Sequence, residues 1–103
     1  MSTPTRIRAT LKDGGTELRM LLSHPMENGL RKDAEGKRIP AHFITELSVR
    51  RNGEVVLAAD FGPSIATNPY LAFSVGGGAA GDEIVVSWRD NLGETRSDTI
   101  RVA

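Results

Sequence analysis

The sequence contains no cysteine among its 103 residues, and this absence excludes several kinds of site. A disulfide framework, a thiolate metal centre and a cysteine nucleophile all require a sulfhydryl group. Aromatic residues are also scarce, at 5% of the chain. No apolar run approaches the roughly 18–20 residues that cross a membrane as a helix. The sequence therefore predicts neither a disulfide-rich scaffold nor a membrane protein.

The chain also lacks an excess of charge of either sign. Its 13 basic and 13 acidic side chains give a formal net charge of zero. Nucleic-acid binding depends on basic side chains that neutralise phosphates, so we expect no nucleic-acid partner. A hydrophobic fraction of 39% argues against disorder, and the length suits one domain over residues 1–103. Residues 1–6 lack the apolar segment of a signal peptide, so we expect no such peptide.

Apolar and polar residues alternate along most of the chain with a period of two, which is typical of half-buried strands. Asn52-Gly53 lies between two such stretches and favours a tight hairpin turn, because both residues tolerate positive φ angles. No segment has a convincing helical period. Seven short strands predict an all-β, immunoglobulin-like antiparallel sandwich. The expected strands are residues 6–12, 17–22, 42–51, 54–61, 70–75, 83–90 and 95–102.

The alternation assigns one side of each strand to the core. Three apolar residues, Ile44, Val56 and Val85, are left on the outward side of the third, fourth and sixth strands. Those strands are neighbours in an immunoglobulin-like sheet, so the three residues should form an apolar stripe. A contiguous stripe indicates a covered surface, either under the long connection or under a partner. The predicted inward residues are Ile7, Ala9, Leu11, Leu18, Met20, Leu22, Phe43, Leu47, Val49, Ile84, Val86, Trp88, Ile100 and Val102.

Residues 24–40 form a connection far longer than an ordinary hairpin loop. Loops of more than about 12–15 residues in compact domains are usually functional or carry structure of their own. Asp33-Ala34-Glu35-Gly36 reads as a turn, so residues 30–32 and 37–39 should pair as a small projecting hairpin. One interpretation is a solvated ribbon, since its charges alternate in sign. The other is a recognition element anchored by Met26, Leu30 and Ile39.

His24 and His42 are the only imidazoles and the only candidates for acid–base or metal chemistry. A zinc or copper site needs three or four convergent ligands, and no His-x-His or HExxH spacing is present. Ser23 and His24 are adjacent, and adjacent strand residues point to opposite faces, so they cannot act as nucleophile and base. We expect no catalytic, cofactor-binding or metal-binding residue, and we expect His24 to pack or hydrogen-bond at the base of the long connection.

Three segments together resemble the SoxZ family, the Z subunits of the Sox sulfur carrier. The first is LSHPMENG at 22–29, which continues through Arg31-Lys32-Asp33 and Gly36-Lys37 to Ile39-Pro40. The second is ATNPYLAF at 66–73, and the third is WRDNLGE at 88–94. Their order and spacing agree with the family over nearly the whole chain.

The resemblance implies a fold, a partner and a pathway. SoxZ proteins are non-catalytic immunoglobulin-like subunits that form a heterodimer with a SoxY-type subunit. The Y subunit carries the sulfur intermediates of thiosulfate oxidation on a cysteine near its C-terminus. Transient contacts with SoxAX, SoxB and a sulfane dehydrogenase are implied as well, as is a periplasmic location reached by export with the partner. Because a covalent sulfur adduct requires a thiolate, the absence of cysteine favours the Z subunit over the Y subunit.

The long connection and the apolar stripe together supply the predicted partner interface, without catalytic or cofactor-binding residues. Two alternatives remain open from the sequence. One is a free-standing immunoglobulin-like ligand- or metal-binding module that uses its two histidines. The other is a small structural domain that self-associates through the stripe. The predicted interface residues are His24, Met26, Arg31, Ile39, Ile44, Val56 and Val85.

Overall fold

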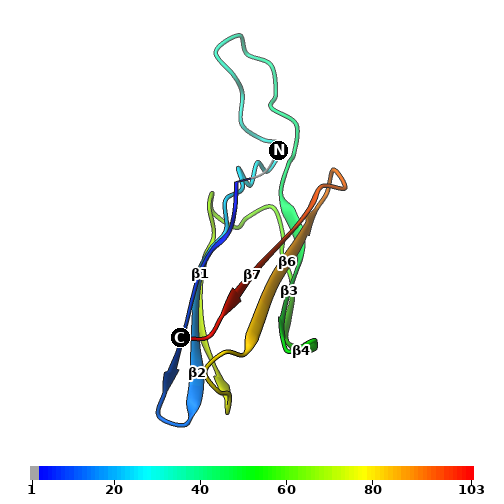
Figure 1. The fold of residues 1–103 in the computed structure, drawn as a ribbon. Helices are drawn as coiled ribbons and strands as arrows, with labels where there is room; N and C mark the ends of the chain where they lie inside the picture. The colour runs from blue at the N-terminus through cyan, green and yellow to red at the C-terminus, as the bar shows by residue number, and fades with distance from the viewer. Residues whose placement is uncertain (1–2) are drawn as a thin grey trace.

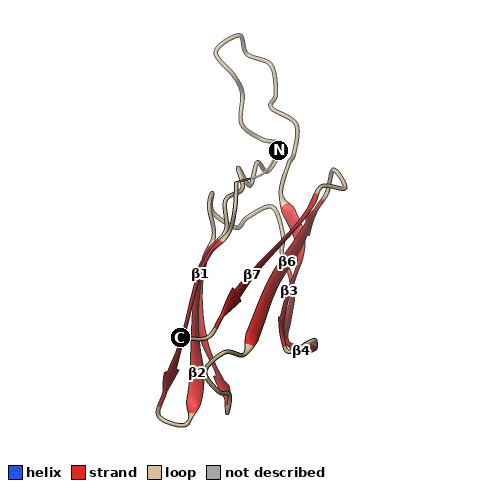
Figure 2. Cartoon of the chain, in the orientation of Figure 1, coloured by secondary structure: helices blue, strands red, loops and turns tan. Residues whose placement is uncertain are grey.

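The computed structural model describes residues 3–103, and these residues form seven strands and no helix (Figure 2). The all-β prediction is therefore confirmed. None of the described residues forms a helix long and apolar enough to cross a membrane. The strands are β1 (Arg6–Lys12), β2 (Gly15–Leu21), β3 (Ile44–Arg51), β4 (Glu54–Asp60), β5 (Tyr70–Gly76), β6 (Glu83–Asp90) and β7 (Thr95–Arg101).

The strands form two antiparallel sheets that face each other as a sandwich (Figure 1). One sheet has the order β1-β2-β5 and the other has the order β4-β3-β6-β7. The prediction that the third, fourth and sixth strands share a sheet is thus confirmed. In a constant-type immunoglobulin domain the fourth strand joins the first, second and fifth. Here β4 pairs with β3 instead, so the second sheet gains a strand.

Two tight turns follow directly from local sequence. Asn52 and Gly53 have φ angles of 52° and 84°, and Asp13 and Gly14 have φ angles of 51° and 78°. Two successive residues with positive φ make the type of turn whose twist matches a β-hairpin. Asparagine, aspartate and glycine are the residues that adopt this backbone at low cost. These dipeptides therefore position β1 against β2 and β3 against β4.

The hydrophobic core lies between the two sheets and contains most of the predicted inward residues. Leu11 is an exception: it lies near the β1–β2 turn and is exposed, so its predicted core position is wrong. Ile7, Phe43 and Ile100 are half-buried and pack against the core. The predicted inward residues that are confirmed as buried are Ala9, Leu18, Met20, Leu22, Leu47, Val49, Ile84, Val86, Trp88 and Val102.

The predicted outward position of Ile44 is wrong, because its side chain is 0% exposed. The β3–β6 ladder pairs Ile44 with Asp90 and Glu46 with Arg89, so β3 holds one extra residue at this point. A bulge of this kind shifts the alternation of side chains by one position. Ile44 therefore turns into the core, which strict alternation could not predict.

A second irregularity displaces Val56 from the predicted stripe. In the β3–β4 ladder Val49 pairs with Leu57 and Arg50 pairs with Val55, which leaves Val56 without a partner. Val56 is half-buried and packs against the core, whereas Val55 is 49% exposed. Of the three predicted residues only Val85 keeps its outward position, opposite Arg50. The stripe of Ile44, Val56 and Val85 does not form.

Residues 27–42, which we call the projecting hairpin, extend beyond the end of the sandwich (Figure 1). Lys32 pairs with Arg38, and the Ile39 amide donates to the Arg31 carbonyl at 2.8 Å. The Asp33 carboxylate accepts from the amides of two residues in its own turn, which stabilises the tip. The predicted pairing is thus confirmed, and the molecule measures 52 × 22 × 20 Å.

The burial of Ile44 leads to a direct test of the bulge. We expect Ile44→Ala to lower the free energy of unfolding by about 2–5 kcal/mol, because it leaves a cavity in the core. We expect Val55→Ala, on the exposed side of β4, to change it by less than about 1 kcal/mol. Urea denaturation of both variants measures the difference. Equal losses of stability would mean that Ile44 does not face the core.

Candidate functional site

The side chain of Asp90, at the end of β6, is the centre of a buried hydrogen-bonded cluster. Its Oδ2 atom lies 3.0 Å from His24 Nε2 and 2.7 Å from His42 Nε2. Its Oδ1 atom accepts from the amides of Leu92 at 3.0 Å and Glu94 at 2.9 Å. Only 2% of Asp90 is exposed. We call His24, His42 and Asp90 the histidine–aspartate cluster.

Each member of the cluster is positioned by the end of a strand. His24 follows β2, His42 precedes β3, and Asp90 ends β6 and caps the turn into β7. Aspartate favours such turns because its carboxylate accepts amides of the residues that follow. The bulge between Ile44 and Glu46 pairs Ile44 with Asp90, which brings the segment containing His42 to the carboxylate. The two sheets therefore meet at this carboxylate.

The hydrogen bonds fix the tautomer of His24. Its Nδ1 atom accepts from the Met26 amide at 3.1 Å, so the proton of the neutral ring lies on Nε2. Nε2–H then donates to Asp90 and has no lone pair free for a metal. The three side chains offer ligand atoms within 4.8 Å of one another, as a metal site would. The tautomer of His24 nevertheless favours a hydrogen-bonded network over a metal centre.

Aromatic packing holds the two imidazoles in place. The ring of His24 lies 4.5 Å from that of His42 and 5.1 Å from that of Trp88, edge-on in both cases. His24 and Trp88 are buried, whereas 27% of the His42 side chain is exposed. Glu94 Oε1 lies 3.9 Å from His42 Nε2, beside a hollow of about 280 Å³. Solvent therefore reaches the cluster on the side of His42.

The electrostatics of the cluster keep Asp90 ionised. Burial raises the pKa of its carboxyl group. Hydrogen bonds from His24, His42 and two backbone amides lower this pKa by more than burial raises it. The net result is a pKa below the usual value for aspartate. A buried carboxylate is tolerated here because four donors replace its hydration shell.

Two asparagines fasten the neighbouring segments to the cluster. Asn68 accepts the His24 amide on its side chain and donates its own amide to the His24 carbonyl, both at 3.0 Å. Asn91 accepts the Phe43 amide at 2.8 Å and donates to the Ala41 carbonyl at 2.9 Å. The segment that leads into the projecting hairpin is thus tied through Asn68, and the returning arm of the hairpin through Asn91.

Met26 completes this base of the hairpin. Its φ angle is 50°, an unusual value for a residue other than glycine. This backbone directs the Met26 amide to His24, while the Met26 sulfur lies 3.3 Å from the Ile44 amide as its acceptor. The side chain is buried in the core. Met26, predicted as an apolar anchor of a recognition element, thus packs into the core of this chain.

The predicted interface residues fall into separate places. His24, Met26 and Ile44 are buried at the base of the projecting hairpin and offer no surface to a partner. Arg31 and Ile39 lie on the hairpin, where Arg31 forms an ion pair with Glu27. Val56 and Val85 lie on the four-stranded sheet. A direct interface role remains a prediction for the residues that reach the surface, which are Arg31, Ile39, Val56 and Val85.

The sequence reasoning missed Asp90, Asn68 and Asn91 as partners of the histidines. No local pattern marks them, because 66 residues separate His24 from Asp90. A signal was present all the same, since Asn68 lies in ATNPYLAF, and Asp90 and Asn91 lie in WRDNLGE. The three segments that carried the family resemblance meet at this one cluster.

Loss of the carboxylate should destabilise the fold. We expect Asp90→Asn to lower the free energy of unfolding at neutral pH by about 2–4 kcal/mol, since it disrupts a buried charged network. The exposed control Asp60→Asn should change it by less than about 0.5 kcal/mol. Because the folded pKa of Asp90 is lowered, its stabilisation is complete above the unfolded value near 3.9. That stabilisation is lost as the pH falls below about 4 through the folded pKa.

Urea denaturation from pH 7 to pH 2.5 measures this effect. The difference in stability between the wild type and Asp90→Asn should shrink below about pH 4, whereas the Asp60→Asn difference stays small throughout. A difference that persists undiminished at the lowest pH would contradict an ionised Asp90.

The tautomer of His24 can be observed directly. Because Nδ1 accepts from Met26, the ¹⁵N chemical shifts of the imidazole should show a protonated Nε2 at neutral pH. Addition of one equivalent of Zn²⁺ or Co²⁺ should leave these shifts unchanged. A protonated Nδ1 would contradict this tautomer, and a Co²⁺ spectrum with imidazole ligands would show that the cluster is a metal site.

Comparison with known proteins assigns the family. The family model described as sulphur oxidation protein SoxZ matches residues 5–101. A comparison with curated proteins finds no match. The match covers both sheets, the projecting hairpin and the histidine–aspartate cluster. The chain therefore belongs to the SoxZ family and has a role in sulfur oxidation.

Proposed function

We propose that the chain is the non-catalytic scaffold subunit of a SoxYZ-type sulfur-carrier heterodimer. The observation that carries this proposal is a SoxZ-family sequence without a thiol. Covalent carriage of sulfur requires a thiolate nucleophile. The SoxY-type subunit then provides the reactive cysteine, and this chain supports the fold of that subunit and positions it.

The state of His24 supports a non-catalytic role. Its Nδ1 accepts a backbone amide and its Nε2 donates to Asp90, so neither nitrogen is available to take a proton from a substrate or from Ser23. A general base must lie within hydrogen-bond reach of the proton that it removes. The buried histidine therefore acts in the structure, where it holds the base of the projecting hairpin.

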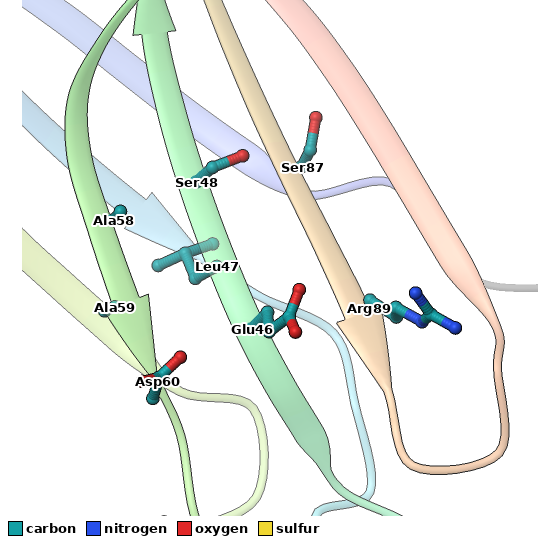
Figure 3. Close-up of a pocket in the computed structure, with 8 residues that line it drawn as sticks. All are labelled: Glu46, Leu47, Ser48, Ala58, Ala59, Asp60, Ser87 and Arg89. Carbon is teal, nitrogen blue, oxygen red and sulfur yellow. The ribbon is translucent and has the colours of Figure 1, made fainter.

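The outward face of the four-stranded sheet is suited to a large partner. Across its middle, small side chains face outward on four successive strands, in the row Ala58, Ser48, Ser87 and Ser97. A shallow depression of about 300 Å³ lies over Ala58, Ser48 and Ser87 of this row. Figure 3 shows Glu46, Asp60 and Arg89 at one end of it. Small side chains let the backbone of another sheet approach closely.

The row that follows along the sheet adds apolar area. Val55, Arg50, Val85 and Thr99 lie side by side there, and Val55 is exposed. A few well-packed residues near the centre of an interface contribute most of its binding energy. We place the SoxY-type subunit on this face, in contact with Val85, the one residue of the predicted stripe that keeps its outward position.

The projecting hairpin offers a second contact region in this proposal. Leu30 is 70% exposed, and Ile39 is half-buried on the opposite arm near Arg31. An apolar group on a fixed arm is suited to brief docking with SoxAX, SoxB and a sulfane dehydrogenase in turn. The proposal includes a periplasmic location, which the chain reaches by export with its partner.

A charged side chain in the middle of the four-stranded face should block the heterodimer. We expect Val85→Arg to lower the affinity for a co-expressed SoxY-type subunit by roughly tenfold or more. Thr10→Arg, which adds the same group to the outward side of β1, is the matched control. Co-purification and isothermal titration measure the affinity, and circular dichroism checks the fold.

The possible outcomes separate the two parts of this proposal. Unchanged binding by Val85→Arg would rule out this face as the contact. No binding of a SoxY-type subunit by the wild-type chain would overturn the scaffold function itself, as would turnover of thiosulfate by the chain alone.

A further inference from the structure

The free edge of β5 differs from the other three sheet edges. Natural edge strands are usually protected from pairing with other chains by charged side chains, by proline or by bulges. β1 and β7 each carry three charged residues, and a bulge interrupts the pairing of β4. β5 has the sequence YLAFSVG, without a charged residue or a proline, and pairs with β2 over seven residues without a shift.

The backbone of β5 presents unused hydrogen-bonding groups along this edge. The bonds from Leu22 to Pro69 and from Gly77 to Gly14 set the phase of the β2–β5 ladder. Alternate residues of an antiparallel strand bond to the same neighbour, so Leu71, Phe73 and Val75 bond to β2. The residues between them direct their N–H and C=O groups away from the sheet. Within residues 3–103 no backbone group bonds to these atoms of Tyr70, Ala72 and Ser74.

The side chains beside this edge would gain from an added strand. Leu71, Phe73 and Val75 pack against the core but are only half-buried, because β5 is the last strand of its sheet. On the outward side Tyr70 is exposed and its neighbours on β5 are small. A further strand would therefore cover apolar surface on the core side without a steric obstacle on the other.

The adjacent sheet face carries a local excess of positive charge, although the whole chain is neutral. The outward side chains of β1 and β2 include Arg6, Arg8, Lys12 and Arg19, against the single acid Glu17. Within residues 3–103 no carboxylate lies within ion-pair distance of either arginine of β1. All three of these arginines, together with Tyr70, line a hollow of about 310 Å³.

The cross-strand pairing places two of these arginines in a row that leads to the β5 edge. Arg8 pairs with Arg19, and Arg19 pairs with Ala72 on β5. Arg19 forms an ion pair with Glu17 at 3.1 Å, yet 53% of its side chain stays exposed, and its cross-strand neighbour Ala72 is small. A carboxylate on the outward side of an added strand would lie at the end of this row.

We propose that the free edge of β5 binds an extended, acidic segment of a partner polypeptide as an additional strand of the three-stranded sheet. The backbone groups of Tyr70, Ala72 and Ser74 would form the ladder, and Arg19 and Arg8 would select carboxylate side chains on its outward face. Strand addition of this kind is a general mode of peptide recognition. A second copy of this chain fits less well, since it would bring an equal excess of positive charge to the same edge.

The test uses the full chain and a synthetic probe. The probe is a capped seven-residue peptide in which valine and glutamate alternate, and its counterpart has lysine in place of glutamate. Amide ¹H–¹⁵N spectra and hydrogen exchange of the protein are recorded during titration. We expect the glutamate peptide to protect the amides of Tyr70, Ala72 and Ser74, and to bind roughly tenfold more tightly than the lysine peptide at low salt. The ratio should approach one in 1 M salt.

Matched variants locate the site and the charge. Ala72→Pro removes an edge N–H that has no internal partner and should lower affinity at least about tenfold. Thr99→Pro, at an equivalent outward position on β7, should leave it unchanged. Arg19→Ser should abolish the preference for glutamate, whereas Arg50→Ser on the other sheet should not. A glutamate peptide N-methylated at alternate residues should not bind, and this control does not depend on how the protein variants fold.

The outcomes decide the proposal clearly. Protection at β1, β4 or β7 in place of β5, equal affinity for the two peptides, or no binding would each overturn it. Protection of the β5 amides that rises with protein concentration alone would show self-association instead, and would overturn it as well. None of these results bears on the scaffold function, because the probe contains no SoxY-type subunit.

Discussion

The end of the molecule from which the hairpin projects depends on one buried negative charge. The carboxylate of Asp90 is stable in the interior only because two imidazoles and two backbone amides donate to it. A buried acceptor that loses its donors costs about 1–3 kcal/mol, and more when it is charged. The segments that carry these donors are therefore held together more firmly than apolar packing alone would hold them. Hydrogen bonds to Asp90 and from the Met26 amide occupy both nitrogens of His24. This histidine therefore stabilises the fold, although histidine is often an acid–base catalyst or a metal ligand in other proteins.

Much of the fold could be predicted from the sequence because it rests on local rules. Alternation located all seven strands within a few residues, and Asn52-Gly53 identified a tight turn. The errors at Ile44 and Val56 have one cause. A bulge before Glu46 turned Ile44 inward, and another beside Arg50 displaced Val56. A bulge depends on how two strands align, and a single strand's pattern does not contain that information.

The candidate site was harder to predict for a related reason. His24 was expected to hydrogen-bond at the base of the long connection, and it does so. Its partner Asp90 lies on another sheet, and only the packing of the two sheets brings the residues together. The family resemblance contained the missing residues, since its three segments meet here. Without the three-dimensional structure, however, Asn68, Asp90 and Asn91 could not be distinguished from residues that simply begin or end strands.

The pairing of Glu27 with His42 has a consequence for how such molecules can vary. These two residues exchange backbone hydrogen bonds of 2.7 and 2.8 Å, and they close the hairpin at its base. The residues between them form a loop whose ends are already held together. The entropic cost of closing such a loop grows only slowly with its length. The tip can therefore be lengthened, shortened or replaced at little cost to the sandwich. How far the chain projects beyond its sandwich can thus change independently of the two sheets that support it.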